Sequence, residues 1–229
     1  MSLLNFSPNG PTEKDFPRRI GIMGGTFDPI HHGHLVVAEE AYWALELERV
    51  IFIPTGNSFH KSERRISSAE DRYMMTCLAT LENEHFRVSR VEIDRHEPSY
   101  TVETLREMRH WFSQGEAKFF FITGIDAVLT ILDWHERDAL PDLCTIVAVN
   151  RPGFDDRAGL DAIQDLPAPL RKVVFPLTVP SLSISSTDVR RRAAEGKNIR
   201  YLVPPLVERY ILKRRLYQEG NHGGIVRKG

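Results

Sequence analysis

Short apolar runs alternate along this chain with segments of helical periodicity, and glycine or proline follows several of the runs. Such runs are typical of buried strands, which we predict at 20–23, 50–53, 118–122, 144–149 and 173–175, with a strand-like segment at 86–93. Strands separated by helices form mainly parallel sheets with right-handed crossovers. The chain is therefore expected to be an α/β protein, doubly wound, with helices on both faces of one sheet.

The helical segments lie between these strands. The capping-box pattern Ser67-x-x-Glu70 predicts a helix that runs to about Leu81. Its inward face is expected to hold Tyr73, Met74, Cys77, Leu78 and Leu81. Further helices are predicted from Ser99 or Thr101, over 127–132, from Ser185 to near Gly196, and after Pro204-Pro205 with Leu206, Tyr210 and Leu216 inward.

Length and charge limit the classes of protein to consider. With 229 residues, the chain suits one domain, predicted at 18–218, between a flexible leader at 1–17 and a flexible tail at 219–229. A net charge of −1 favours neither nucleic acid nor an anionic membrane as a partner. The oligomeric state is left open.

The expected compartment is the cytoplasm. No apolar run approaches the length of a membrane span, and the first residues lack the features of a signal peptide. The two cysteines, Cys77 and Cys144, lie in apolar surroundings without metal-like spacing. Reduced thiols in a reducing compartment fit this pattern.

Residues 20–34 form the stretch around which the site is expected to be built. The apolar run ends at Gly24-Gly25, where main-chain N–H groups can approach an anion closely, and a helix start follows. His31 and His34 are three residues apart, so both imidazoles can share one helix face, with Gly33 leaving room between them. This arrangement predicts a phosphate-binding loop.

These residues resemble the (His/Thr)-x-Gly-His element of the nucleotidylyltransferase superfamily, and in particular the nicotinate-nucleotide adenylyltransferases. A second match lies at 184–190, which is similar to the element Ile-Ser-(Ser/Thr)-Thr-x-(Ile/Val)-Arg. One turn beyond the serine caps, the Arg190 guanidinium can reach over the helix start and help to hold a polyphosphate. Arg191 and Arg192 are expected to be solvated.

Further segments extend the resemblance over roughly residues 20–216. Residues 54–61 match the family's acceptor loop, except that Ser58-Phe59 replaces its usual prolines. Residues 98–105 and 124–135 match two more family segments, and Arg151-Pro152-Gly153 matches a family turn. The resemblance implies a Rossmann-like fold, in agreement with the alternation of strands and helices.

The resemblance also assigns roles to individual residues. The catalytic set would be His31, His34 and Arg190. The ATP-binding residues would be Gly24, Gly25, Thr26, Phe27, Gly124, Asp126, Ile184, Ser185, Ser186 and Thr187. The mononucleotide-binding residues would be Thr55, His60, Lys61, Thr101, Val102, Trp134 and His135. Mg²⁺ would accompany ATP, and no protein metal site is expected.

The implied reaction joins ATP and nicotinate mononucleotide, giving nicotinate adenine dinucleotide and pyrophosphate in NAD biosynthesis. Nicotinamide mononucleotide and phosphopantetheine are alternative acceptors, although phosphopantetheine enzymes resemble a shorter chain. A non-catalytic nucleotide sensor is the alternative from another class. An aminoacyl-tRNA synthetase shares a related His-x-Gly-His element, but this chain has little room and no basic excess for tRNA.

Overall fold

A computed structural model describes residues 19–56, 66–95, 97–112, 117–150 and 156–218. Its centre is a six-stranded sheet in the order β3-β2-β1-β4-β5-β6, in which every neighbouring pair is parallel. The strands are β1 (Arg19–Gly25), β2 (Arg49–Pro54), β3 (Phe86–Val88), β4 (Lys118–Gly124), β5 (Thr145–Asn150) and β6 (Val174–Thr178). The predicted parallel α/β fold is confirmed.

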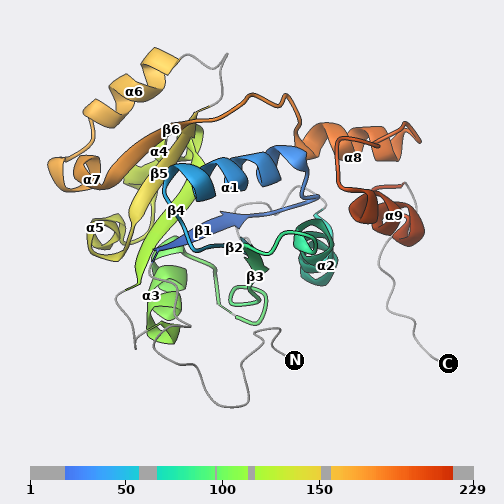
Figure 1. Cartoon of the computed structure of the whole chain (residues 1–229), viewed down its shortest axis with the longest axis horizontal. Helices are drawn as coiled ribbons and strands as arrows, with labels where there is room; N and C mark the ends of the chain where they lie inside the picture. Colours follow the sequence, from blue (N-terminus) through green and yellow to red (C-terminus); the bar gives the residue numbers. More distant parts are fainter. Residues whose placement is uncertain (1–18, 57–65, 96, 113–116, 151–155, 219–229) are drawn as a thin grey trace.

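Helices cover both faces of this sheet (Figure 1). They are α1 (His32–Ala44), α2 (Ala69–Thr80), α3 (Thr101–Trp111), α4 (Ile125–Leu129), α5 (Leu140–Leu143), α6 (Asp156–Gln164), α7 (Ala168–Val173), α8 (Ser186–Ala194) and α9 (Pro205–Arg214). Short 3₁₀ turns, Ile131–Asp133 and Arg137–Ala139, follow α4. Each face of the sheet can therefore bury its own apolar layer.

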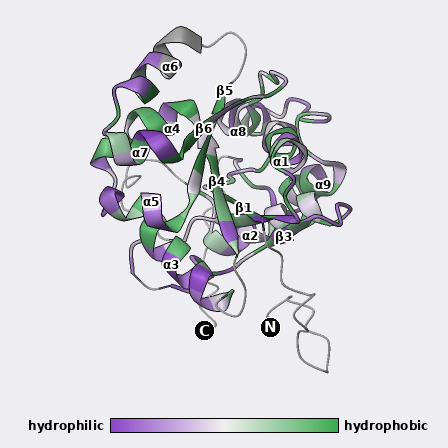
Figure 2. Cartoon of the chain, turned by 60° about the vertical axis from the view of Figure 1, so that its left-hand side comes forward, coloured by the Kyte–Doolittle hydropathy of each residue, from purple (hydrophilic) through white to green (hydrophobic). Residues whose placement is uncertain are grey.

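The two apolar layers alternate along the strands, as the pleat of a sheet requires. On β4, Phe120 and Ile122 face the layer built by α1, α2, α8 and α9, whereas Phe119 and Phe121 face the layer built by α3 to α7. In Figure 2 the hydrophobic colour accordingly gathers on the central strands. This double covering makes the strands apolar on both sides, which explains their continuous apolar sequence.

The topology fixes where a ligand can bind. The strand order reverses between β1 and β4, because the chain passes outward from β1 to β3 and then returns to the other side of β1. In open parallel sheets, ligands bind beyond the carboxyl ends of the strands at such a switch point. Gly24-Gly25 closes β1 and Gly124 closes β4, so both segments stand at this edge.

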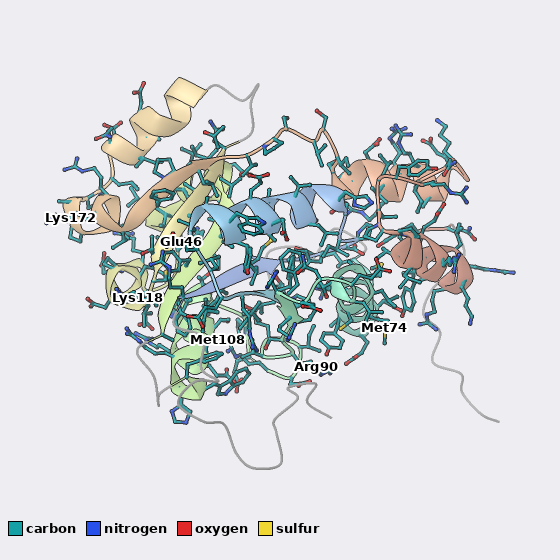
Figure 3. All side chains as sticks on the ribbon, in the orientation of Figure 1. Glu46, Met74, Arg90, Met108, Lys118 and Lys172 are labelled. Atoms are coloured by element: carbon teal, nitrogen blue, oxygen red, sulfur yellow. The ribbon has the colours of Figure 1, made fainter. Side chains whose placement is uncertain are left out.

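Helix α2 differs from its prediction in its start and its buried face. Ser68, not Ser67, caps the helix: its Oγ accepts the Asp71 N–H at 3.0 Å. Met74 and Leu81, expected inward, are 42% and 70% exposed, and Figure 3 shows Met74 beside the ribbon of α2. The buried face instead includes Asp71 and Arg72, which bond to neighbouring segments, and Thr76, whose hydroxyl donates to the Arg72 carbonyl of the same helix. Apolar periodicity alone could not reveal such a face.

Other predicted element boundaries also differ from those in the structure. The strand predicted over 86–93 ends at Val88, where a turn closed by the Asp94 N–H and the Arg90 carbonyl begins. The helix predicted over 127–132 spans 125–129, and the last strand spans 174–178 rather than 173–175. On α9, Val207 and Ile211 are buried, whereas the predicted Leu206, Tyr210 and Leu216 are only half-buried.

The predictions for the ends of the chain, a leader at 1–17 and a tail at 219–229, fall outside the described residues. The single domain predicted at 18–218 stays a prediction, and the described residues within it are arranged about one sheet. None of the helices in the described part of the chain is long and apolar enough to cross a membrane.

Candidate functional site

The loop after β1 is shaped by a glycine and a left-handed residue. A Cβ on Gly25 would lie 2.9 Å from the ring of Phe27, so only glycine fits there without displacing that ring. Phe27 has a φ of 49° and is buried, and its ring meets the His34 imidazole edge-on at 5.2 Å. The loop therefore folds back onto the start of α1.

The two predicted imidazoles stack on each other at the start of α1. The His31 and His34 ring centroids are 3.8 Å apart, with 27° between the planes. His34 Nδ1 accepts the His31 main-chain N–H at 3.2 Å, so the other ring nitrogen, Nε2, is the one that can donate a proton outward. A Cβ on Gly33 would lie 3.0 Å from the His31 ring, which confirms that this glycine makes room.

The start of α8 packs directly against this loop. Ser185 caps α8, since its Oγ accepts the Asp188 N–H at 3.1 Å, and Ser186 Oγ donates to the Pro29 carbonyl at 2.9 Å. Arg190 Nη1 donates to the Asp28 carbonyl at 2.6 Å, and its Nη2 donates to Thr187 Oγ1 at 3.2 Å. The start of α8 and the Arg190 guanidinium thus contact residues 28–29, just before the start of α1.

The neighbouring arginines behave as expected for surface residues. Arg191 and Arg192 both pair with the Asp188 carboxylate on their own helix, Arg192 at 2.7 Å. Their charges are therefore largely used within α8, whereas Arg190 turns toward the loop after β1. This difference gives Arg190 a distinct role among the three.

The chain behind the loop is anchored by a buried carboxylate. Asp28 is 2% exposed, and its two oxygens accept the Tyr217 hydroxyl at 2.8 Å and the Ser67 N–H at 3.3 Å. Burial raises the pKa of Tyr217 well above its ordinary value, and the negative charge of Asp28 raises it further. Two distant segments, at Ser67 and at Tyr217, thus hold the loop that carries the histidines.

A cavity of about 290 Å³ opens beside the same loop, at the switch point. It brings together six residues predicted for substrate binding, Gly24, Gly25, Thr26, Thr55, Thr101 and Trp134. The Trp134 ring lies edge-on to Phe121 at 5.9 Å, and hydroxyl groups of threonine and serine line much of the remaining wall. An apolar ring beside several hydroxyls suits a flat heterocycle with polar substituents.

Other predicted residues lie outside the cavity lining. Val102 is buried in the core near the start of α3, and His135 stacks on Tyr100 at 4.2 Å. Asp126 is exposed in the first turn of α4, with its carboxylate folded over Gly124. His31, His34 and Arg190 are not among the residues that line the cavity, whereas residues 24–26 of the loop that leads to His31 do line it. His60, Lys61 and the turn at 151–153 lie outside the described residues.

Sequence reasoning missed Glu92, whose side chain lines the cavity although it is only 8% exposed. Its Oε1 accepts the Thr104 hydroxyl at 2.8 Å. Burial raises the pKa of Glu92, while hydrogen bonding from Thr104 and the charge of Arg95 oppose that rise. The available signal was an acidic residue between Val91 and Ile93, in a segment that otherwise reads as buried.

Replacing Glu92 by glutamine is expected to stabilise the fold at neutral and higher pH. A carboxyl whose pKa is higher in the folded state favours folding below its unfolded pKa and loses that contribution as pH rises through its folded pKa. Glu92→Gln removes the charge but keeps an acceptor for Thr104. Calorimetry should show Tm higher by about 2–4 °C above neutrality, with the gain shrinking toward pH 4. A gain that grows on acidification would contradict this assignment.

The chain belongs to the cytidylyltransferase-like family, whose family model matches residues 22–192. It is 47% identical over 213 residues to the probable nicotinate-nucleotide adenylyltransferase of Moorella thermoacetica, covering 93% of this chain and 97% of that one. The corresponding protein of Streptomyces coelicolor is 49% identical over 196 residues, with coverages of 86% and 99%. Within the family, the chain groups with the nicotinate-nucleotide adenylyltransferases of NAD biosynthesis.

Solved structures share the fold at lower sequence identity. The Plasmodium falciparum nicotinic acid mononucleotide adenylyltransferase complexed with NaAD superimposes with a TM-score of 0.69 at 20% identity, covering 87% of this chain and 97% of that one. The structure of a putative nicotinate-nucleotide adenylyltransferase from Vibrio parahaemolyticus superimposes with a TM-score of 0.62 at 18% identity, covering 88% of this chain and 96% of that one. The Rossmann-like architecture is therefore common to these proteins.

Proposed function

We propose that this enzyme joins ATP and nicotinate mononucleotide to form nicotinate adenine dinucleotide and pyrophosphate. The mononucleotide phosphate, already ionised, attacks the α-phosphorus in line with the departing pyrophosphate, so neither a protein base nor a covalent intermediate is required. The protein's task is to position two anions and to offset the charge that develops between them. The observation that supports the proposal is that Arg190 Nη1 donates to the Asp28 carbonyl, in the loop that leads to the stacked His31 and His34 rings.

In this proposal His31, His34 and Arg190 bind the triphosphate. His34 Nε2, His31 and Arg190 donate to phosphate oxygens, together with main-chain N–H groups of the loop at 24–27 and of the segment 184–187 at the start of α8. Gly124 and Asp126 face the nucleoside, where a carboxylate can accept ribose hydroxyls. The donors to the phosphate oxygens favour the charge of the transition state over that of free ATP, whereas Gly124 and Asp126 position the nucleoside.

The cavity takes the pyridine mononucleotide. Trp134 stacks on the ring, and Thr101 with the main-chain N–H groups of Val102 and His135 holds the carboxylate. Val102 is the second residue of α3, where main-chain N–H groups have no partner within the helix and attract an anion. Thr55, His60 and Lys61 would bind the mononucleotide phosphate.

The proposal includes Mg²⁺ as the companion of ATP, since phosphate oxygens and water are the hard ligands it prefers. Among the described residues no group of three or more His, Cys, Asp or Glu side chains is placed to hold a metal. The proposal also includes action in the cytosol, and the two free thiols, Cys77 and Cys144, fit such a reducing compartment.

Rates with the two pyridine mononucleotides test the acceptor. Donor N–H groups at the start of α3 match a carboxylate, which only accepts hydrogen bonds, better than an amide that also donates. We expect kcat/KM for nicotinate mononucleotide to exceed that for nicotinamide mononucleotide by about 100-fold or more. Pyrophosphate release is the readout, and phosphopantetheine serves as the third acceptor. Equal rates for acid and amide would remove the carboxylate assignment, and no release with any acceptor would favour the sensor alternative.

A further inference from the structure

Arg72 is a buried arginine that donates to three main-chain carbonyl oxygens. It lies in the first turn of α2 and is 3% exposed. Its Nη1 donates to Thr26 at 2.9 Å, its Nη2 to Gly56 at 3.1 Å and its Nε to Ser67 at 3.2 Å. The planar guanidinium therefore donates to three separate segments of main chain at the same time.

The three carbonyls belong to segments that surround the cavity. Thr26 lies in the loop after β1 that leads to the histidines, and Gly56 follows β2 at the start of the acceptor loop. Ser67 lies on the α2 side of that loop. One guanidinium thus joins Gly56, just after β2, and Ser67, just before α2, to the loop at 24–28.

The main chain at Gly56 is tightly packed. A Cβ on Gly56 would lie 1.9 Å from the Glu92 carbonyl oxygen, so its main chain packs tightly against the segment that carries Glu92. Its own carbonyl is held from the other side by Arg72. These two contacts therefore fix the main chain at Gly56, where the chain leaves β2.

The Arg72 charge is also weakly compensated. Within the described residues no carboxylate forms an ion pair with Arg72. Burial lowers the pKa of Arg72, and the more distant charges of Asp28 and Glu92 oppose that change. A buried cation bonded to neutral carbonyls leaves a positive field behind the loops that meet the substrates.

We propose that Arg72 is a positioning residue for adenylyl transfer: it holds the loop at 24–28 in register with the chain at Gly56, where it leaves β2, so that the two substrates meet in line. This inference rests on the proposed function. It predicts that loss of Arg72 impairs both substrates together, because both loops depend on the same guanidinium. A residue needed only for folding would instead lower the amount of active protein and leave KM unchanged.

The test compares Arg72→Met and Arg72→Lys with the wild type and with a matched control. Arg109→Met is the control, since Arg109 also donates to a carbonyl, that of Asp142, but at the surface outside the cavity lining. Initial rates are measured with ATP and nicotinate mononucleotide varied in turn, alongside calorimetric Tm and hydrogen exchange of the amides around Thr26 and Gly56.

For Arg72→Met we expect kcat/KM to fall about 100-fold, with KM raised for both substrates and faster exchange in both loops. Arg72→Lys should recover part of the loss, because it restores charge but not the three-way fork, and Arg109→Met should match the wild type. Wild-type KM and kcat in the folded fraction of Arg72→Met would overturn the proposal. If that variant does not fold, wild-type kinetics of Arg72→Lys would overturn it. An inactive wild type would instead refute the proposed function.

Discussion

Replacing His34 by alanine is expected to lower turnover by about 10²–10³-fold while leaving the fold intact. The His34 ring is held by its stack on His31 and by the hydrogen bond that its Nδ1 accepts from the His31 main-chain N–H. This bond leaves Nε2 as the ring nitrogen that can donate outward. Such a donor contributes most when charge builds on the phosphate oxygens. The effect should therefore appear chiefly in kcat, measured as dinucleotide formation at saturating ATP and nicotinate mononucleotide.

His32→Ala is the matched control for this variant. His32 lies in the same turn of α1 and is half-buried like His34, but it is not among the residues predicted to bind substrate. Its variant should keep near wild-type turnover, and both variants should keep a cooperative thermal transition. Near-normal adenylyl transfer by a folded His34→Ala protein would refute the role of this imidazole.

Replacing Arg190 by methionine is the second change with a large expected effect. Methionine keeps much of the packing of the side chain but removes the donors to Asp28 and Thr187 and the charge beside the imidazoles. We expect kcat/KM for ATP to fall about 10²–10³-fold. Arg190→Lys should recover only part of this, because an ammonium cannot reproduce the forked geometry.

Arg191→Met gives the comparison on the same helix. The Arg191 guanidinium forms an ion pair with Asp188 at the surface. Its removal should therefore leave kcat/KM near the wild-type value. Equal losses for the two variants would show that the general positive charge of α8 matters, and not the placement of Arg190. Steady-state rates with ATP varied distinguish these outcomes.

The parts of the fold that sequence predicted well are those governed by local chemistry. The apolar strands, the cap at Ser185 and the His-x-Gly-His arrangement at 31–34 each depend on residues close together in the chain. The resemblance then placed His34 and Arg190 in one family pattern. The bond from Arg190 to the Asp28 carbonyl, in the loop that leads to the histidines, depends on packing between segments more than a hundred residues apart.

The parts that sequence missed depend on long-range polar contacts. Arg72 and Asp71 read as ordinary exposed charges at the start of a helix, yet both are buried because main-chain carbonyls and Tyr210 satisfy them. Glu92 is buried for the same reason, through Thr104. No periodicity signals such residues, since their partners come from loops whose courses the local sequence does not fix.

The most direct test of the account is a crystal structure with a non-hydrolysable ATP analogue bound. The account predicts that His34 Nε2 and the Arg190 guanidinium both lie within hydrogen-bonding distance, about 2.7–3.2 Å, of oxygens of one triphosphate. A triphosphate that contacts only one of them, or that lies in a separate cavity, would contradict it.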